Sequence, residues 1–214
     1  MIRVNWLLAI GLTIAAFLAS VALYNGLPES IPTHWNIRGE IDHYGSKQWA
    51  LFSMPAAMLA LMGLFAALPW LSPRRFEVGR FRPTYLYIMV VLVGLMGYIH
   101  SLMLYSAWSG QRSVARAMVG GIFLVFALTG NVLGKVRPNF YMGVRTPWTL
   151  ASERVWNDTH RVTAWLFVCC GLIGFVIALT GFFVAAFALL LVLAAVPILY
   201  SLVLYKQYER RGEL

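Results

Sequence analysis

The fold is decided by the stretch from Val162 to Tyr205, which reads VTAWLFVCCGLIGFVIALTGFFVAAFALLLVLAAVPILYSLVLY and contains no charged residue. A helix needs about 20 mainly apolar residues to cross the hydrocarbon core of a membrane, which is about 30 Å thick. The stretch is too long for one such helix, and the dipeptide Thr180-Gly181 offers a break inside it. It therefore predicts two spanning helices, at residues 162–180 and 183–205.

Outward from this stretch, the same criterion finds four further spans, at residues 4–24, 50–72, 85–108 and 117–134. The first apolar run is longer than the apolar core of a typical signal peptide, so we expect it to be retained as a span. Composition agrees, because only 12% of the residues are charged, whereas soluble domains carry about 25%. The sequence predicts an all-α polytopic membrane protein, a bundle of six transmembrane helices.

The orientation follows from the basic residues, which give the chain a net charge of +9. With the N-terminus in the cytoplasm, most lysines and arginines lie on the cytoplasmic side, as the positive-inside rule requires. Both termini and the long connection 135–161 are then cytoplasmic, and the long connection 25–49 is extracytoplasmic. We assign the positive charge to topology and to contacts with membrane lipid, and we expect no direct binding of nucleic acid.

The inner connection concentrates the polar chemistry of the chain. Residues 138–147 are expected to be extended, with Gly143 available for a turn. Thr149 is the predicted N-cap of a helix that continues without a break from Leu150 into the next span. Its hydroxyl can accept a backbone hydrogen bond, and Glu153 in the first turn suits the positive end of a helix.

Helical spacing in the same connection predicts an ion pair between Arg154 and Asp158, which are four residues apart. Trp156 falls on the more apolar side of this helix, at the expected depth of the lipid head groups. One interpretation is therefore that arginine and tryptophan only anchor an amphipathic helix at the membrane surface.

The string GVRTPWTL, followed by Val155-Trp156 and His160-Arg161, closely resembles the signature of the SdpI bacterial immunity-protein family. Asn131 in the preceding span and Asn139 before the string also fit this signature. The resemblance implies a set of motif or partner-binding residues: Asn131, Asn139, Gly143, Arg145, Thr146, Pro147, Trp148, Thr149, Leu150, Trp156, His160 and Arg161.

The outer connection, LYNGLPESIPTHWNIRGEIDHYG, is similar to the small N-terminal domain that often precedes an SdpI domain. Its His-x-Asn-x-x-Gly pattern is matched by His34, Asn36 and Gly39. The expected organisation is an N-terminal two-helix domain at 1–72, a cytoplasmic linker at 73–84 and an SdpI-like four-helix domain at 85–214.

The resemblance implies a multi-pass protein of the bacterial cytoplasmic membrane that protects its cell against a secreted antimicrobial peptide toxin. In one branch of the family, such a protein also holds a cytoplasmic transcriptional repressor at the membrane. The expected partners are thus membrane lipid, a peptide toxin and a repressor. Holding a hydrophobic toxin requires apolar and aromatic contacts rather than catalysis, so we expect neither enzymatic activity nor a cofactor.

Three interpretations of the outer connection stay open. We favour the interpretation that His34 and Asn36 hydrogen-bond the loop's own backbone and that the remaining polar groups face water. They could instead form a surface that contacts a ligand, made of His34, Trp35, Asn36, Gly39 and Asp42. The third interpretation is a zinc-dependent hydrolase site, because His34, Glu40, Asp42 and His43 lie close together in the sequence. These four residues do not have the spacing of a known zinc motif.

His100 is the one ionisable residue well within a span, and such residues suggest function by default. We expect it to pack as a neutral imidazole against a hydroxyl group on a neighbouring helix. Asn131, near the inner end of its span, is expected to brace the inner connection. A transporter or channel would need a polar path, for which the spans offer little beyond these two residues. Gly94, Gly97 and the pair Gly120-Gly121 are expected to permit close helix contacts.

Overall fold

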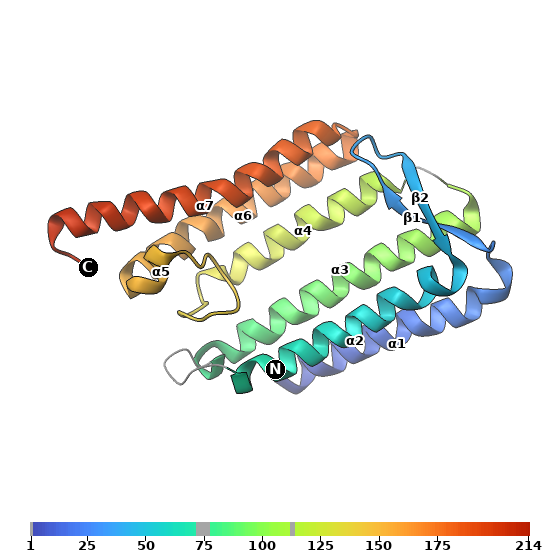
Figure 1. Cartoon of the computed structure of the whole chain (residues 1–214), viewed down its shortest axis with the longest axis horizontal. Coiled ribbons are helices and arrows are strands. Elements are labelled where there is room, and N and C mark those ends of the chain that lie inside the picture. Colours follow the sequence, from blue (N-terminus) through green and yellow to red (C-terminus); the bar gives the residue numbers. More distant parts are fainter. Residues whose placement is uncertain (1, 72–77, 112–113) are drawn as a thin grey trace.

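A computed structural model describes residues 2–71, 78–111 and 114–214 (Figure 1). The elements in chain order are α1 (Ile2–Leu23), η1 (Tyr24–Gly26), β1 (Ser30–Trp35), β2 (Ile41–Ser46), α2 (Lys47–Leu71), η3 (Val78–Phe81), α3 (Arg82–Ser109), α4 (Ala115–Leu133), α5 (Pro147–Ala151), α6 (Glu153–Thr180) and α7 (Phe183–Arg211). Helices α1, α2, α3, α4, α6 and α7 are each long and apolar enough to cross a membrane. The prediction of an all-α bundle with six spans is confirmed.

Several helix boundaries in the structure differ from those predicted from the sequence. Helix α6 begins at Glu153 and so includes polar residues before the predicted span 162–180, and α7 continues past the predicted end at residue 205 to Arg211. The predicted break is correct: α6 ends at Gly181, which has φ +84° and therefore ends the helix in the left-handed conformation. Part of the predicted linker 73–84 lies outside the described residues.

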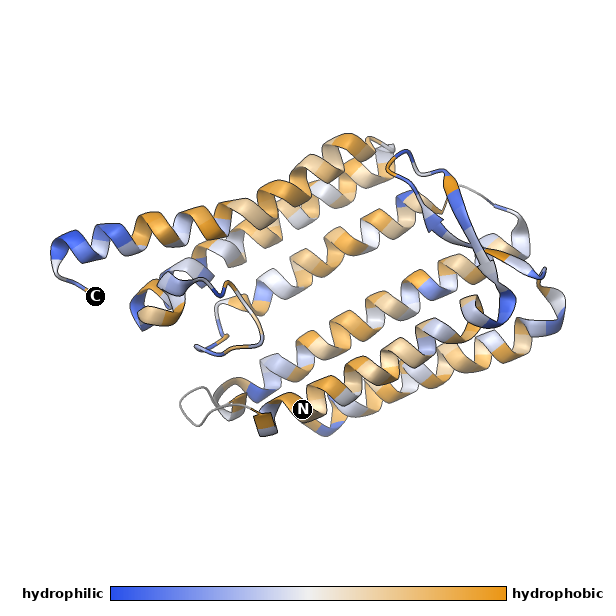
Figure 2. Ribbon diagram, in the orientation of Figure 1, coloured by the Kyte–Doolittle hydropathy of each residue, from blue (hydrophilic) through white to orange (hydrophobic). Residues whose placement is uncertain are grey.

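Helices α1, α2 and α3 lie together on one side of the bundle, and α4, α6 and α7 lie together on the other (Figure 1). The β1–β2 hairpin lies across one end of both groups, while the two chain ends and the connection that carries α5 lie at the opposite end. Figure 2 shows apolar residues along the helices and hydrophilic residues in the hairpin and at the far end of α7. The two polar ends are thus separated by an apolar belt, as a membrane requires.

Glycine allows α4 and α6 to touch at the backbone. A Cβ atom added at Gly171 would lie 2.6 Å from the nitrogen of Ala127 and 2.8 Å from the carbonyl oxygen of Phe123. One added at Gly130 would lie 2.8 Å from the carbonyl oxygen of Ala164. Lipid tails are as apolar as the helix surface, so the hydrophobic effect does not drive helices together inside a membrane. Close packing of this kind is therefore a main source of helix association.

The glycines predicted from the sequence to allow close contacts have mixed outcomes. Gly121 does lie against a neighbouring helix, since an added Cβ would be 2.7 Å from the ring of Tyr98. The prediction for Gly94 is wrong, because no atom lies within 4 Å of the position that its Cβ would take. Sequence alone does not show which side of a uniformly apolar helix faces another helix.

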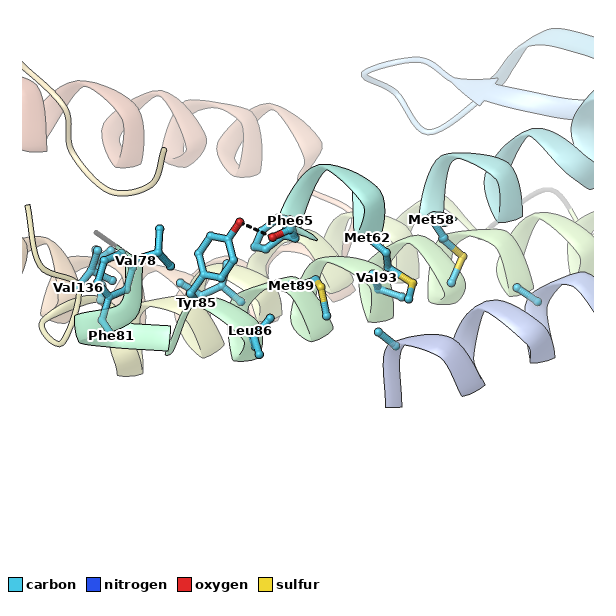
Figure 3. Close-up of a cluster of buried hydrophobic side chains, with 14 of the residues drawn as sticks. Met58, Met62, Phe65, Val78, Phe81, Tyr85, Leu86, Met89, Val93 and Val136 are labelled. Carbon is cyan, nitrogen blue, oxygen red and sulfur yellow. Dashed lines mark hydrogen bonds between the residues drawn. The ribbon is translucent and has the colours of Figure 1, made fainter. Parts of the chain in front are cut away.

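Two prolines inside α2 explain a set of polar contacts in the bundle. Pro55 and Pro69 have no N–H, so the carbonyl groups four residues earlier have no partner within the helix. In both places a hydroxyl group from a neighbouring helix donates the missing hydrogen bond. Ser20 Oγ donates to the Leu51 oxygen at 2.7 Å, and the Tyr85 hydroxyl donates to the Phe65 oxygen at 2.8 Å (Figure 3). These bonds hold α1 and α3 against α2.

His100 also contacts Ser20, the donor to the Leu51 oxygen. Its Nε2 atom lies 2.9 Å from Ser20 Oγ, whose hydroxyl has two carbonyl acceptors, Leu51 at 2.7 Å and Ala16 at 3.2 Å. With the serine proton directed to one of these carbonyl oxygens, the imidazole donates through Nε2–H to the serine oxygen. The predicted hydroxyl partner on a neighbouring helix is thus Ser20, and the structure does not bring His100 and Asn131 together.

Tyr85→Phe is expected to destabilise the protein by about 1 kcal/mol, because it leaves the buried Phe65 carbonyl without a donor. Pro69→Ala restores an N–H group four residues after Phe65, so Tyr85→Phe should cost much less in that background. Thermal unfolding in detergent of the four variants of this double-mutant cycle measures the difference. Equal costs in the two backgrounds would show that the tyrosine does not act through this carbonyl.

Candidate functional site

The inner connection folds around the string that resembles a family signature. Thr146 is the N-cap of the short helix α5, and Pro147 occupies its first turn. Thr146 Oγ1 accepts the N–H of Thr149 at 3.2 Å, while Thr149 Oγ1 accepts the N–H of Thr146 at 2.9 Å. The prediction of Thr149 as N-cap is therefore wrong: it is the third residue of a reciprocal capping box, as expected when proline takes the first helical position.

The predicted unbroken helix is also wrong, because the chain leaves helical geometry at Ser152. This residue has φ −137° and ψ 124°, and its Oγ accepts the N–H of Val155 at 3.4 Å, so it begins α6 as a second N-cap. Two caps in seven residues give the connection a fixed corner between α5 and α6. Thr146 also lies 3.0 Å from Ser201 Oγ of α7, which fixes the corner against the last helix.

Asn139 organises the loop that precedes α5. Its side chain is fully buried, and its amide nitrogen donates to the carbonyl oxygens of Arg137 at 2.8 Å and Met142 at 3.1 Å. Its amide oxygen accepts the N–H groups of Tyr141 at 2.7 Å and Met142 at 2.8 Å. All the hydrogen-bonding capacity of this amide is therefore used to hold the backbone of the loop in one conformation.

His160 connects this loop to α6. Its Nε2 accepts the backbone N–H of Val144 at 3.0 Å, and its Nδ1 lies 2.8 Å from the carbonyl oxygen of Trp156. A backbone N–H can only donate and a carbonyl can only accept, so the imidazole must carry its proton on Nδ1 and be neutral. The ring is fully buried and stacks on Trp156 at a centroid distance of 4.1 Å.

Trp156 completes the buried framework. Its indole N–H donates to the carbonyl oxygen of Val136 at 2.8 Å, and none of its surface is exposed. It was predicted to lie at the depth of the lipid head groups, but the structure places it inside the protein, in a buried apolar cluster that also contains residues of α1, α2 and α3. This cluster connects the start of α6 with the other half of the bundle.

Gly143 allows the loop to approach His160. Its φ of +98° is unfavourable for any residue with a side chain, and a Cβ atom there would overlap the Nε2 atom of His160. The bond between Val144 and His160 therefore depends on glycine at this position.

The remaining motif residues lie at the surface or partly covered. The exposed ones are Arg145, Pro147, Arg161 and Asn131, and the partly buried ones are Trp148 and Leu150. The guanidinium of Arg145 donates to the Phe140 carbonyl oxygen, which holds the tip of this exposed side chain against the loop. Within the described residues Asn131 has no side-chain hydrogen bond to the inner connection, so the expectation that it braces this connection is not supported.

The predicted ion pair between Arg154 and Asp158 is replaced by contacts with the end of the chain. Arg154 binds the carboxylate of Glu213 at 3.0 Å, and its guanidinium lies 4.3 Å from the centre of the Tyr208 ring. The Tyr208 hydroxyl donates to Asp158 at 2.6 Å. Sequence spacing missed these partners because they come from α7 and the residues after it, about 50 residues away.

At the opposite end, the outer connection forms a hairpin that the sequence analysis did not predict. Strands β1 and β2 pair antiparallel, with an irregularity in register around His34. Asn36 forms the turn, since its side-chain oxygen accepts the N–H groups of Arg38 at 2.8 Å and Glu40 at 3.1 Å. The expectation that Asn36 hydrogen-bonds the loop's own backbone is confirmed. Gly39, with φ +78°, lies against the ring of Phe183 at the start of α7.

The charged side chains of the hairpin pair with one another. His34 Nδ1 lies 2.5 Å from Asp42, rather than bonding the backbone as expected. Arg38 lies 3.0 Å from Glu40, and hydrogen bonds from Asn36 and then from Arg38 hold the pKa of the Glu40 carboxyl below its usual value. No three histidine, cysteine, aspartate or glutamate side chains of the described residues are grouped so that they could hold a metal ion, so the zinc interpretation has no ligand set there.

Two parts of the chain match known protein families. Residues 135–201, which hold the inner framework, match the SdpI/YfhL protein family. The resemblance of the sequence to this family is confirmed over these residues. Residues 11–59 match a domain of unknown function, DUF1648, in agreement with the resemblance of the N-terminal part. The whole chain is 28% identical to Immunity protein SdpI of Bacillus subtilis (strain 168) over 91% of both chains. No solved structure matches it.

The signature divides in this structure into a buried framework and an exposed face. The framework consists of Asn139, Thr146, Thr149, Trp156 and His160. Sequence reasoning missed Ser152 and Ser201, which cap α6 and support Thr146. The pair Thr146-Pro147 carried a signal for the true cap, because proline is favoured immediately after an N-cap. The arrangement provides a rigid surface element, which suits recognition.

Proposed function

We propose that this chain is an immunity protein of the bacterial cytoplasmic membrane that protects its cell against a secreted antimicrobial peptide toxin. The similarity to Immunity protein SdpI over 91% of both chains is the observation that carries this proposal. The signature residues also form one fixed framework in this structure. This supports the view that their similarity to the family signature reflects a shared structural role and not chance. This function needs no cofactor and no catalysis.

The arrangement of the polar ends supports a division of roles. Both chain ends and the inner connection lie at one end of the bundle, and the hairpin lies at the other (Figure 1). With the termini in the cytoplasm, the hairpin would meet the toxin outside. The exposed residues around Arg145 would contact lipid or a cytoplasmic partner, for which a transcriptional repressor is our proposal. In this division, residues 1–72 form the outer capture unit and residues 85–214 form the signalling unit.

A deletion strain complemented with the chain tests the proposal. Wild-type protein should restore survival in the presence of membrane-active peptides. Arg145→Ala should reduce survival to that of the deletion strain, because Arg145 is exposed and contributes to the surface of the signature rather than to its buried framework. Trp148→Ala should have the same effect. Survival of the strains is compared with the amount of each variant in the membrane fraction.

Arg211→Ala is the matched control, since Arg211 is also exposed and basic but lies at the end of α7 outside the signature. It should protect as well as wild type. Full protection by both the Arg145 and Trp148 variants would refute a functional role for the signature surface. Failure of the wild-type chain against all peptides tested would refute the immunity function itself.

A further inference from the structure

Helix α7 contains an internal proline, Pro197. Proline has no N–H, so the carbonyl oxygen of Leu193, four residues earlier, lacks its usual backbone donor. For the prolines of α2, hydroxyl groups of other helices supply the missing hydrogen bond. At the Leu193 oxygen, no side chain of residues 2–71, 78–111 and 114–214 does so. Sharp bends in helices occur mainly at such positions, so α7 can bend at Pro197.

The packing of α7 differs on the two sides of this proline. Before it, Ala186 and Leu193 belong to a buried apolar cluster with residues of α4 and α6. After it, Leu204 is buried, but no residue of 198–211 belongs to a buried apolar cluster in the part of the chain that the structure describes. The first part of α7 is therefore fixed in the apolar core of the bundle, and the last part is not.

Polar contacts hold the last part of α7 instead. Ser201 Oγ lies 3.0 Å from Thr146 Oγ1 at the N-cap of α5. Two turns later, the Tyr208 hydroxyl donates to Asp158 of α6 at 2.6 Å. Residues seven apart lie on the same face of a helix, so one face of α7 meets both α5 and α6. The contact with α5 is thus linked through α7 to the contact with α6.

The residues after α7 add a third contact. Gly212, with φ +67°, ends the helix in the left-handed conformation, and the N–H of Glu213 then bonds the carbonyl oxygen of Tyr208 at 3.0 Å. This turn brings the Glu213 carboxylate to 3.0 Å from Arg154 in the first turn of α6. The side chains of Arg154 and Glu213 are 52% and 35% exposed. Exposed ion pairs contribute little stability and are screened by salt, so this contact can open at little cost.

We propose that residues 198–213 form a hinged arm, which bends at Pro197 and covers one side of the signature helix α5 while it is attached to α6. In the attached state, Ser201 supports Thr146. In the released state this hydrogen bond is lost, and that side of α5 becomes accessible. The regulatory role of the arm rests on the proposed function, in which the surface around α5 recognises a partner.

Double electron–electron resonance of the full chain in lipid nanodiscs tests the arm. Nitroxide labels are attached at two exposed positions, Lys135→Cys after α4 and Arg210→Cys on the arm. The native cysteines Cys169 and Cys170 are replaced by alanine. The attached arm should give one narrow distribution of distances between the labels. A bend of about 20° at the proline would move the end of the arm by about 7 Å.

Tyr208→Phe combined with Glu213→Gln is the released variant, because it removes both contacts with α6. It should broaden the distribution by about 7 Å. Tyr205→Phe combined with Glu209→Gln is the matched control. These two residues are of the same types and lie on the same arm, but they contact Lys206 within α7. The control should keep the narrow distribution.

Pro197→Ala separates a hinge from general loosening of the helix end. Alanine restores an N–H group for the Leu193 oxygen, so the released variant should keep a narrow distribution in this background. Equal broadening with and without the proline would overturn the proposal. So would a narrow distribution for the released variant in the presence of the proline.

Hydrogen–deuterium exchange reports on α5 itself. Amides of residues 147–151 should exchange about fivefold faster in the released variant than in the matched control, because α5 loses its contact with Ser201. Unchanged exchange there would refute the covering of α5 by the arm. Neither measurement uses cell survival. Failure of the wild-type chain to protect would therefore refute the immunity function without affecting the arm, and an arm that never moves would leave the immunity function intact.

Discussion

Gly171→Ala is expected to destabilise the protein by about 2 to 3 kcal/mol, which is the upper range for overpacking a buried contact. The added methyl group would lie 2.6 Å from the nitrogen of Ala127 and 2.8 Å from the oxygen of Phe123, both backbone atoms that cannot turn aside. Helices α4 and α6 would have to separate, and their remaining contacts would weaken together. Thermal unfolding in detergent should show the lower stability.

Gly63→Ala is the control for this change. Gly63 also lies inside a spanning helix, but no atom lies within 4 Å of the position that its Cβ would take. Alanine there should be neutral or slightly stabilising, because it restricts the unfolded chain more than glycine does. A similar loss in both variants would mean that the contact between α4 and α6 does not set the cost.

The six spans could be predicted because the bilayer imposes one strong rule on sequence, namely about 20 apolar residues for each crossing. The contacts between the spans could not. Nothing in the local sequence distinguishes Gly171, which touches backbone, from Gly63, which touches nothing. The donors to the proline-exposed carbonyls were equally hidden, because Ser20 and Tyr85 lie on other helices than Pro55 and Pro69.

The hairpin was missed for a different reason. Its first strand contains Pro32, which cannot donate to a ladder and is unusual in strands away from an edge. In a sheet of only two strands every strand is an edge, so proline is tolerated. Asn36 was correctly expected to bond the backbone. The hairpin packs against α2 and α3, and the local sequence does not show these contacts.

The family signature showed where the candidate site lies but not how its residues work. Arginine and tryptophan were expected to anchor a helix at the membrane surface, yet Trp156 is fully buried. His160 was part of the string, but its partner is a backbone N–H 16 residues earlier. A helical wheel compares residues of one helix only, so it cannot reveal a contact with a loop.

Gly143→Ala is expected to open the inner framework while the six spans stay in the membrane. Alanine at φ +98° is strained, and its methyl group would overlap His160 Nε2. The N–H of Val144 would then lose its acceptor. Strain and a lost buried hydrogen bond together should cost about 2 kcal/mol of local stability, which corresponds to about thirtyfold faster amide exchange. Hydrogen–deuterium exchange of the segment 139–150 measures this effect.

Gly134→Ala is the matched control in the same connection, because Gly134 has φ −64° and no atom within 4 Å of its Cβ position. It should leave both exchange and protection unchanged. If the signature acts as a rigid surface, Gly143→Ala should also remove protection although Arg145 and Trp148 are intact. Protection that survives faster exchange would contradict this, since it would mean that the exposed side chains act without the conformation that His160 and Gly143 maintain.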